Sequence, residues 1–448
     1  MFQGLARSEL SALGISGLPL VTIEHPLGGE RSEGISRRAR EAVDQLTHLL
    51  AQPISTGTGE IARAEPARTS LRPPSVQAGL TAPATTNPAT TSITVLDTPE
   101  AVLAAFCERQ WCDGLPIVPP TEACVRAMLG GASGDRSLGV MPPLWRLATL
   151  EKLAINAVMA GCGPEHLPLL IAAVRCLAEP KMYLRNKAMS TGPHAPLVLV
   201  NGPKGRAANL NAGMCALGPG APSASNTVLG RAVRLTMMNV GHTYVGVSDM
   251  DTIGSPLKYS LCCAENETAS PWAPYHVTRG YAREASTVTV HFVYGICELH
   301  DFRSTRPEDL IQVFATAVTN VAQVGTGLWL IGRRADPRYK TEEREHNTLF
   351  VCPEHAQIFA REGWDRARIQ EALYKAARLP FRTLMLNKEP KAREAAHPEL
   401  GWLADHPDLP LPVVEEPGCF DIAVVGGAAG RGAYFYGAGE PVTMPVEG

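Results

Sequence analysis

Apolar and polar positions follow two different periods along residues 93–448, and the change between them marks the expected elements. Apolar residues three and four apart predict helices, whereas short β-branched runs predict strands. Leu150, Leu153 and Ala157 form the clearest helix face. Thr149 is its expected N-cap and Gly161 its expected end, because these residue types satisfy the free backbone groups at helix termini.

Several further segments carry the same two signals. Helices are expected at residues 164–177, from Pro353 onward, after an Asp365 cap, and behind a capping box formed by Thr305 and Glu308. Strands are expected at residues 194–203, 286–299, 327–331, 347–351 and 421–425. Strands that alternate with helices predict an α/β fold, here a mixed multi-lobe α/β body in which residues 93–448 form one main domain or two lobes. No internal repeat is visible in the sequence.

The segment before this body has a different character. Residues 1–52 predict a small α/β arm, with a strand at 18–23 and a helix at 36–50. Residues 53–92 are rich in Pro, Ala, Thr and Ser and contain almost no large apolar residue, so they predict a flexible linker. An arm this small buries little surface by itself, so we expect it to dock on the rest of the chain or on another subunit. The second alternative predicts a homo-oligomer such as a dimer.

The composition sets limits on partners and location. Hydrophobic residues make up 45% and charged residues 19% of the 448 positions, which is typical of a packed protein. The net charge of −3 does not favour nucleic-acid binding, because neutralising phosphates requires a basic surface. We see no apolar run of the roughly 18 residues that a membrane span needs and no signal-peptide pattern, so we expect a cytoplasmic protein without a membrane partner. The 11 cysteines are then expected to be mostly free thiols.

A proline-rich loop, WCDGLPIVPP at residues 111–120, places a thiol beside a carboxylate. The negative charge of Asp113 should raise the pKa of Cys112. The loop either presents Cys112 or Asp113 to a pocket or is a rigid connection packed on Trp111.

A second segment, AGCGPEHLP at residues 160–168, ends one helix and starts another. The free N–H groups of the new helix would lower the pKa of Cys162. Cys162 and His166 could instead hold a metal ion, although two ligands do not make a site. A simple Gly-Pro hinge would have the same sequence.

A glycine-rich segment at residues 217–235 is the candidate anion site. It delivers hydroxyl and amide side chains to a helix start, where backbone N–H groups and the helix dipole favour an anion. The Lys-Ser/Thr ending of the Walker pattern is missing, and an ordinary capped helix would carry the same residues. The candidate substrate-binding residues are Gly218, Gly220, Ser223, Ser225, Asn226 and Arg231.

The polar segment at residues 248–272 is the candidate source of acid–base residues. A polar segment of this length between a helix and a strand is more often a functional loop than a plain connection. A surface loop with its charges in water would have the same composition. Lys258 and Glu265 lead this set, and Asp249 joins them. Cys262 and Cys263 are adjacent, and we expect one of them to be buried and the other exposed.

Three further positions suggest a metal or a base. Glu298 and His300 stand two apart at a strand end and could hold a metal ion or form a base with its orienting group. His355 opens a helix, whose N-terminus would lower the pKa of its imidazole. A strand end in solvent and a helix cap are the plainer interpretations. Since no nucleotide or flavin motif is present, no such cofactor is predicted, and metal binding stays open.

Several phrases resemble known bacterial sequences. Residues 1–50, with LPLVTIEHPLGG as their most specific part, resemble the C-terminal half of the UGSC family, small bacterial proteins named for a motif with selenocysteine or cysteine. That redox motif lies upstream of the matching half, so the resemblance assigns no redox residue here. The remainder resembles uncharacterised bacterial proteins that often accompany UGSC proteins, through DGLPIVPP, INAVMAGCGPEHLP, SNTVLGRAVRL and CCAENETASPW.

Three functional hypotheses follow. The first is an enzyme, a lyase or hydrolase, that acts on a small polar or anionic organic molecule held by the glycine-rich segment. Its acid–base or nucleophilic residues would come from Lys258, Glu265, Asp249, Cys112, Asp113 and Cys162. The second is a thiol- or metal-dependent protein with Cys, His and Glu ligands. The third is a non-catalytic subunit that the N-terminal arm tethers to a redox-motif protein.

Overall fold

The computed structural model describes residues 3, 6–7, 10, 17–23, 32–50, 92–321, 344–384 and 398–447. The chain divides between Thr94 and Val95 into two units. In the first unit, helix α2 (Ser32–Leu50) confirms the predicted helix and begins four residues before the predicted start. The strand predicted at 18–23 is wrong: these residues form a bend and irregular chain, since the described part of this unit offers no second strand to pair with.

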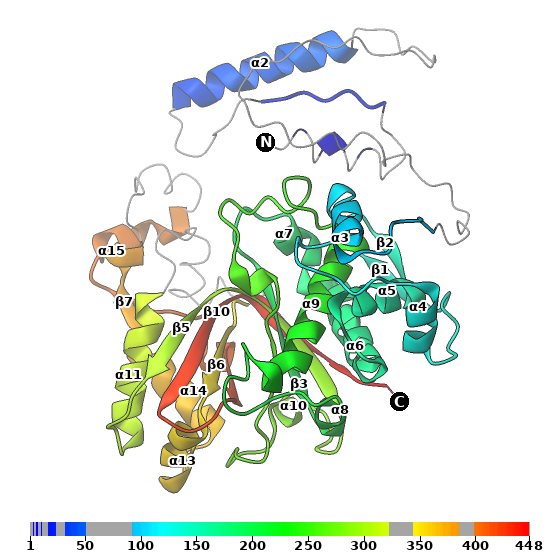
Figure 1. Ribbon diagram of the computed structural model, residues 1–448. Coiled ribbons are helices and arrows are strands. Elements are labelled where there is room, and N and C mark those ends of the chain that lie inside the picture. Colours follow the sequence, from blue (N-terminus) through cyan, green and yellow to red (C-terminus); the bar gives the residue numbers. More distant parts are fainter. Residues whose placement is uncertain are drawn as a thin grey trace. The chain divides into compact units, whose positions relative to one another are not determined.

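The second unit alternates strands and helices, which confirms the predicted α/β fold (Figure 1). Its helices are α3 (Pro99–Glu108), α4 (Glu122–Leu129), α5 (Leu150–Ala160), α6 (Leu167–Ala178), α7 (Leu184–Ala188), α8 (Pro203–Ala207), α9 (Ala224–Asn239), α10 (Tyr275–Thr278), α11 (Pro307–Asn320), α13 (Pro353–Arg361), α14 (Arg366–Ala376) and α15 (Phe381–Leu384). Its strands are β1 (Ser137–Met141), β2 (Arg146–Thr149), β3 (Ala195–Asn201), β4 (Cys262–Ala264), β5 (Thr287–His300), β6 (Asn347–Val351), β7 (Arg378–Pro380), β8 (Pro410–Pro412), β9 (Phe420–Val424) and β10 (Arg431–Pro445).

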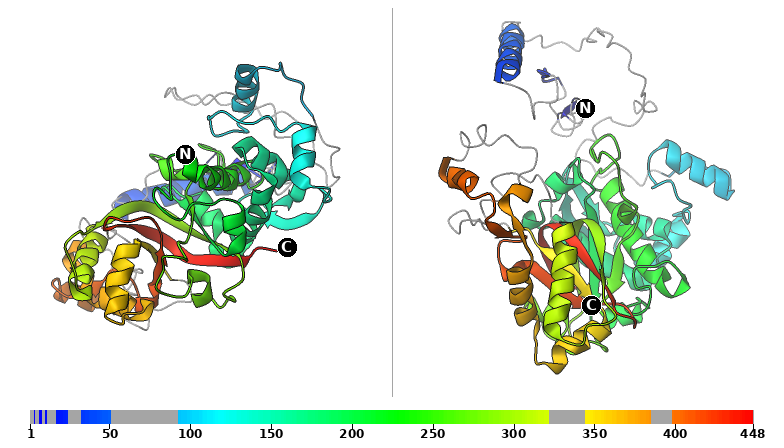
Figure 2. Two further views of the ribbon diagram at one scale, coloured as in Figure 1. Left: turned by 60° about the horizontal axis from the view of Figure 1, so that its bottom comes forward. Right: turned by 90° about the vertical axis from the view of Figure 1, so that its left-hand side faces the viewer.

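The main sheet has two halves of the same design. Its strand order is β4-β3-β5-β10-β6-β9, so the long antiparallel strands β5 and β10 lie side by side at the centre (Figure 2). On each outer side a parallel pair follows, β3 with β4 and β6 with β9. Each half also runs in the same chain order: strand, helices, parallel edge strand, long central strand. The repeat is one of topology, which the sequence did not indicate.

The sheet curls until its two edges approach each other. Directly after β4, the backbone N–H of Asn266 donates to the carbonyl of Val424 at 2.7 Å. The side-chain amide of Asn266 also donates to the carbonyl of Gly426 at 3.1 Å. The two edges are therefore joined at one end of the sheet, and one face of every strand points into an enclosed interior.

Three apolar clusters correspond to this arrangement. The outer face of β3 and β5 packs against α5, α6 and α9. The outer face of β6 and β9 packs against α11, α13 and α14. The interior face carries its own cluster, which includes Leu197, Val293, Phe350 and Phe435. Because successive side chains of a strand point to opposite faces of the sheet, alternate residues belong to the outer clusters and to the interior cluster. The polar groups described below also lie on the interior face.

The structure confirms two of the predicted helix N-caps, Thr149 and Asp365. The Thr149 hydroxyl accepts the N–H of Lys152 at 3.4 Å, and the Asp365 carboxylate accepts the N–H of Arg368 at 2.8 Å. The predicted Thr305 capping box is wrong. Helix α11 begins at Pro307, so Arg306 occupies the N-cap and no side chain caps the helix. The strand predicted at 327–331 lies outside the described residues.

The central strand β10 was missed because its sequence is rich in glycine and proline, which are depleted in strands. Two of its glycines allow neighbours to approach closely. A Cβ at Gly432 would lie 2.4 Å from the carbonyl oxygen of Phe350. A Cβ at Gly437 would lie 2.3 Å from the imidazole of His291. Pairing on both sides therefore overrides the weak local preference of this segment.

Candidate functional site

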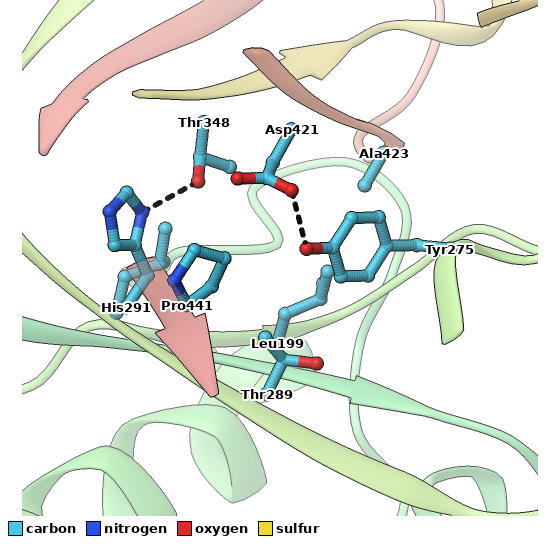
Figure 3. Close-up of a pocket in the computed structure, with 9 residues that line it drawn as sticks. Leu199, Tyr275, Thr289, His291, Thr348, Asp421, Ala423 and Pro441 are labelled. Atoms are coloured by element: carbon cyan, nitrogen blue, oxygen red, sulfur yellow. Dashed lines mark hydrogen bonds between the residues drawn. The ribbon is translucent and has the colours of Figure 1, made fainter. Parts of the chain in front are cut away.

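A small cavity lies on the interior face of the curled sheet (Figure 3). Its volume is about 10 Å³, close to the least that one water molecule needs. The lining combines apolar strand residues with hydroxyl, imidazole and carboxylate groups from five strands and helix α10. The residues are Leu197, Leu199, Tyr275, Thr289, His291, Thr348, Asp421, Ala423 and Pro441.

Asp421 is the centre of the polar groups at this cavity. Its Oδ1 accepts the phenolic O–H of Tyr275 at 2.8 Å, and its Oδ2 contacts Nδ1 of His346 at 2.7 Å. The guanidinium of Arg279 lies 3.8 Å from Oδ1. Burial opposes ionisation of Asp421, but the hydrogen bond from His346 and the positive charge of Arg279 outweigh it and lower the pKa. The group is therefore a carboxylate at neutral pH.

Tyr275 supplies a proton-bearing hydroxyl. Burial, followed by the negative charge of Asp421, raises the pKa of Tyr275 well above its ordinary value. The phenol consequently stays protonated and donates to the carboxylate. Its backbone N–H is fixed in turn, since it donates to Oε2 of Glu265 at 2.6 Å.

His291 projects inward from β5 and is neutral. Burial lowers the pKa of His291 to about 3. Its Nε2 lies 3.1 Å from the carbonyl oxygen of Gly439, which can only accept, so Nε2 carries the proton. Nδ1 then accepts the hydroxyl of Thr348 at 2.8 Å. We call Tyr275, His291, His346, Thr348 and Asp421 the interior network.

Glu265 directly follows the edge strand β4, and its carboxylate contacts the backbone N–H of Val424 in the other edge strand, β9, at 3.5 Å. Its carboxylate accepts from Asn201 Nδ2 at 2.6 Å and from the guanidinium of Arg366 at 3.0 Å. Burial raises the pKa of Glu265, and the charge of Arg366 opposes this shift. Of the three acid–base candidates predicted from residues 248–272, Glu265 is the one that contacts the interior network.

Asp249 and Lys258, the other two, belong to a separate buried cluster. Asp249 accepts from Arg234 at 2.9 Å and from Lys258 at 3.0 Å. Lys258 also pairs with Asp251 at 2.7 Å. These side chains are at most 12% exposed. We call Arg234, Asp249, Asp251 and Lys258 the Asp249 network. Arg234 joins helix α9 to the polar segment at this point.

The polar groups of the predicted anion site bind their own loop. The Ser223 hydroxyl donates to the carbonyl of Cys215 at 2.6 Å. The Asn226 amide donates to the carbonyls of Asn211 and Ala216, each at 2.7 Å. Gly218 and Gly220 have φ values of +84° and +125°, which provide the turns before α9. Ser225 is half-buried at the start of that helix.

Arg231 joins α9 to the proline-rich loop. Its Nε and an Nη donate to the two oxygens of Asp113 at 2.7 and 2.8 Å, a bidentate pair. Another Nη donates to the carbonyl of Pro116 at 2.9 Å. Two residues predicted for separate sites therefore bind each other.

The 11 cysteines are free thiols, as expected. The predicted activation of Cys162 is wrong, because burial raises its pKa to about 12. The pKa of Cys112 is raised to about 11, chiefly by burial, with Asp113 adding a smaller effect in the predicted direction. Cys262 and Cys263 are both buried, contrary to the expected one exposed thiol, since Cys262 packs in the outer cluster with helix α9 and Cys263 packs in the interior cluster.

The remaining candidate ligands have other neighbours. Glu298 pairs with Arg431, and the His300 ring contacts Phe302 at 4.5 Å between centroids. His166 Nδ1 accepts the N–H of Gly163 at 3.1 Å. Within the described residues, no three His, Cys, Asp or Glu side chains are grouped so that they could hold a metal ion.

The lowered pKa predicted for His355 is wrong. Burial lowers it, but the hydrogen bond with Cys352 outweighs this effect, and the pKa is raised. The contact with the carbonyl oxygen of Asp301, 2.8 Å from Nε2, acts in the same direction.

None of the five residues of the interior network was predicted to be functional. His291, His346 and Asp421 each stand inside or beside a strongly apolar strand segment. An ionisable residue on the buried face of such a strand is unusual, because burying a charge without a partner is costly. That signal was present in the sequence, but the partners come from strands far apart along the chain.

Comparison of the chain with family models, curated proteins and solved structures gave no significant match. No helix in the described part of the chain is both long and apolar enough to cross a membrane.

Proposed function

We propose that this protein is an enzyme that performs acid–base chemistry of the lyase or hydrolase type on a small polar or anionic organic molecule. The observation that carries the proposal is Asp421, an ionised carboxylate that binds both Tyr275 and His346 at the edge of a cavity. Buried ionisable groups with shifted pKa values beside a cavity are typical of catalytic sites. The matching of a carboxylate with a protonated phenol gives one proton acceptor and one proton donor at the same place.

The roles follow from the hydrogen bonds. The Asp421 carboxylate, held by His346, accepts a proton from the substrate. The Tyr275 phenol has one proton, so it turns from Asp421 toward a bound substrate and there donates to a developing negative charge on a substrate oxygen. The Thr348 hydroxyl, whose proton is directed at His291, offers its lone pairs to a substrate donor. Because the cavity is no larger than about one water molecule, it admits one hydroxyl- or carbonyl-sized group of the substrate.

A matched pair of tyrosine variants tests this proposal. The full chain is incubated with a panel of small hydroxy acids, amides, lactones and dicarboxylic acids, and conversion is followed by proton NMR. Tyr275→Phe removes the hydroxyl at the cavity, whereas Tyr281→Phe removes one that donates to the carbonyl of Thr443 at 2.7 Å outside the cavity lining. We expect Tyr275→Phe to lower kcat/KM about a hundredfold and Tyr281→Phe to leave it within about twofold. Equal effects of the two variants would contradict the site.

A further inference from the structure

Two cysteines of the α3 region lie in contact. Cys107 is in the last turn of α3 and Cys112 is in the proline-rich loop that follows, and their Sγ atoms are 3.4 Å apart. Cys107 is exposed to solvent, whereas Cys112 is buried. This pair lies apart from the interior network and has no role in the proposed chemistry.

The backbone between them returns the chain onto its own helix. Gln110 has a left-handed φ of +58°, which ends α3 and reverses the chain. The N–H of Trp111 donates back to the carbonyl of Phe106 at 2.9 Å, and the two rings pack edge to face with centroids 5.6 Å apart. The closeness of the two thiols is therefore set by a defined helix end.

The far side of the loop is fixed as well. The Asn239 amide donates to the carbonyl of Trp111 at 2.8 Å, and Arg231 holds Asp113 by two hydrogen bonds. Helix α9 thus anchors the residues on both sides of Cys112. A bond between the thiols needs side-chain rotation and a closure of the gap by roughly 1.4 Å to the length of a disulfide, without a change of fold.

We propose that Cys107 and Cys112 are a reversible redox pair that forms an intramolecular disulfide by exchange with a small-molecule disulfide. The Cys107 thiolate attacks one sulfur of the small disulfide, forms a mixed disulfide and releases one thiolate. Deprotonated Cys112 then attacks the sulfur of Cys107, closes the protein disulfide and releases the second thiol. Two protein thiols are oxidised, the small disulfide is reduced to two thiols, and the protons of Cys107 and Cys112 pass to the products.

The order of attack follows from exposure. Burial raises the pKa of Cys112 to about 11, with the neighbouring Cys107 adding to the shift, so Cys112 is seldom ionised and solvent reaches it poorly. Cys107 is the thiol that an external disulfide reaches. The product would tie the end of α3 to the loop that Arg231 holds.

The experiment treats the full chain with oxidised glutathione and maps the peptides by mass spectrometry without reduction. In the unaltered protein we expect one cross-linked peptide containing Cys107 and Cys112, lighter by two hydrogen atoms and reversed by dithiothreitol. Cys112→Ser should retain one glutathione on Cys107, because no second thiol resolves it. Cys107→Ser should give neither the disulfide nor an adduct on Cys112. Cys124→Ser, which removes an exposed cysteine of α4, is the control and should form the disulfide as the unaltered protein does.

Three results would overturn the proposal. The first is an unaltered protein whose Cys107 and Cys112 both stay reduced. The second is a stable glutathione adduct on Cys107 while Cys112 is present. The third is a disulfide from either residue to a different cysteine.

Discussion

Two buried polar networks in the described part of the second unit differ in what surrounds their carboxylates. The Asp249 network has two cations and two carboxylates, each in contact with an opposite charge, and none of its four residues lines the cavity of the interior network. The interior network holds one carboxylate, Asp421, which accepts from hydroxyl and imidazole groups, has the guanidinium of Arg279 at 3.8 Å, and borders a cavity. Charges that pair directly with one another hold helices and loops in place, whereas polar groups beside a cavity can exchange protons with a ligand. We therefore expect the Asp249 network to govern stability and the interior network to govern activity.

The largest effect is expected from Asp421→Asn. An amide cannot accept a proton, and its NH₂ group would face a donor, so kcat should fall by about 10² to 10⁴. The measurement is the steady-state rate with a substrate identified by the NMR panel. Asp251→Asn is the matched control, since it changes an equally buried carboxylate of the Asp249 network. If Asp251→Asn lowered kcat as much in a folded protein, the division of roles between the networks would be wrong.

Asp249→Ala should produce the largest loss of stability. It leaves the guanidinium of Arg234 and the ammonium of Lys258 without the carboxylate between them. Removing one partner from a buried ion pair costs about 3–5 kcal/mol, because the remaining charge stays in a low-dielectric surrounding. Urea unfolding measures the change. A loss under about 1 kcal/mol, the range of exposed pairs, would show that water reaches this network.

The free energy of unfolding should fall as the pH drops below about 6.5. His291 has a folded pKa of about 3, far below the ordinary 6.5, so its neutral form is favoured in the folded state. Between these two values the unfolded chain binds a proton that the folded chain does not, and stability is lost as the pH falls. One such group contributes a slope of about 1.4 kcal/mol per pH unit. His291→Gln should remove that slope between about pH 6 and 4 in urea titrations, while His194, whose pKa is lowered to about 4, keeps a similar one. An unchanged slope in His291→Gln would mean that His291 is protonated in the folded state.

The sequence predicted the elements better than the site, for a physical reason. Helix caps such as Thr149 and Asp365 are local, so three or four residues suffice to identify them. The interior network joins Tyr275, His291 and Asp421, which only a curled sheet of six strands brings together. The same holds for Arg231, which reads as a free cation on its helix and is bound by Asp113 from a loop far away in the sequence.

Arg231→Lys is expected to have the smallest effect on stability. It extends the comparison to an ion pair that lies outside both networks. The Asp113–Arg231 pair is buried to a similar degree, but much of its bonding comes from the planar guanidinium, which holds two carboxylate oxygens and the carbonyl of Pro116. Lysine keeps the positive charge but loses the planar group that holds these three oxygens at once. We therefore expect the free energy of unfolding, measured with urea, to fall by about 1 kcal/mol. Asp113→Ala, which removes the charge partner, should cost more than Arg231→Lys. If Arg231→Lys lowered the free energy of unfolding as much as Asp249→Ala, the geometry of the guanidinium rather than the pairing of charge would decide how these buried pairs stabilise the fold.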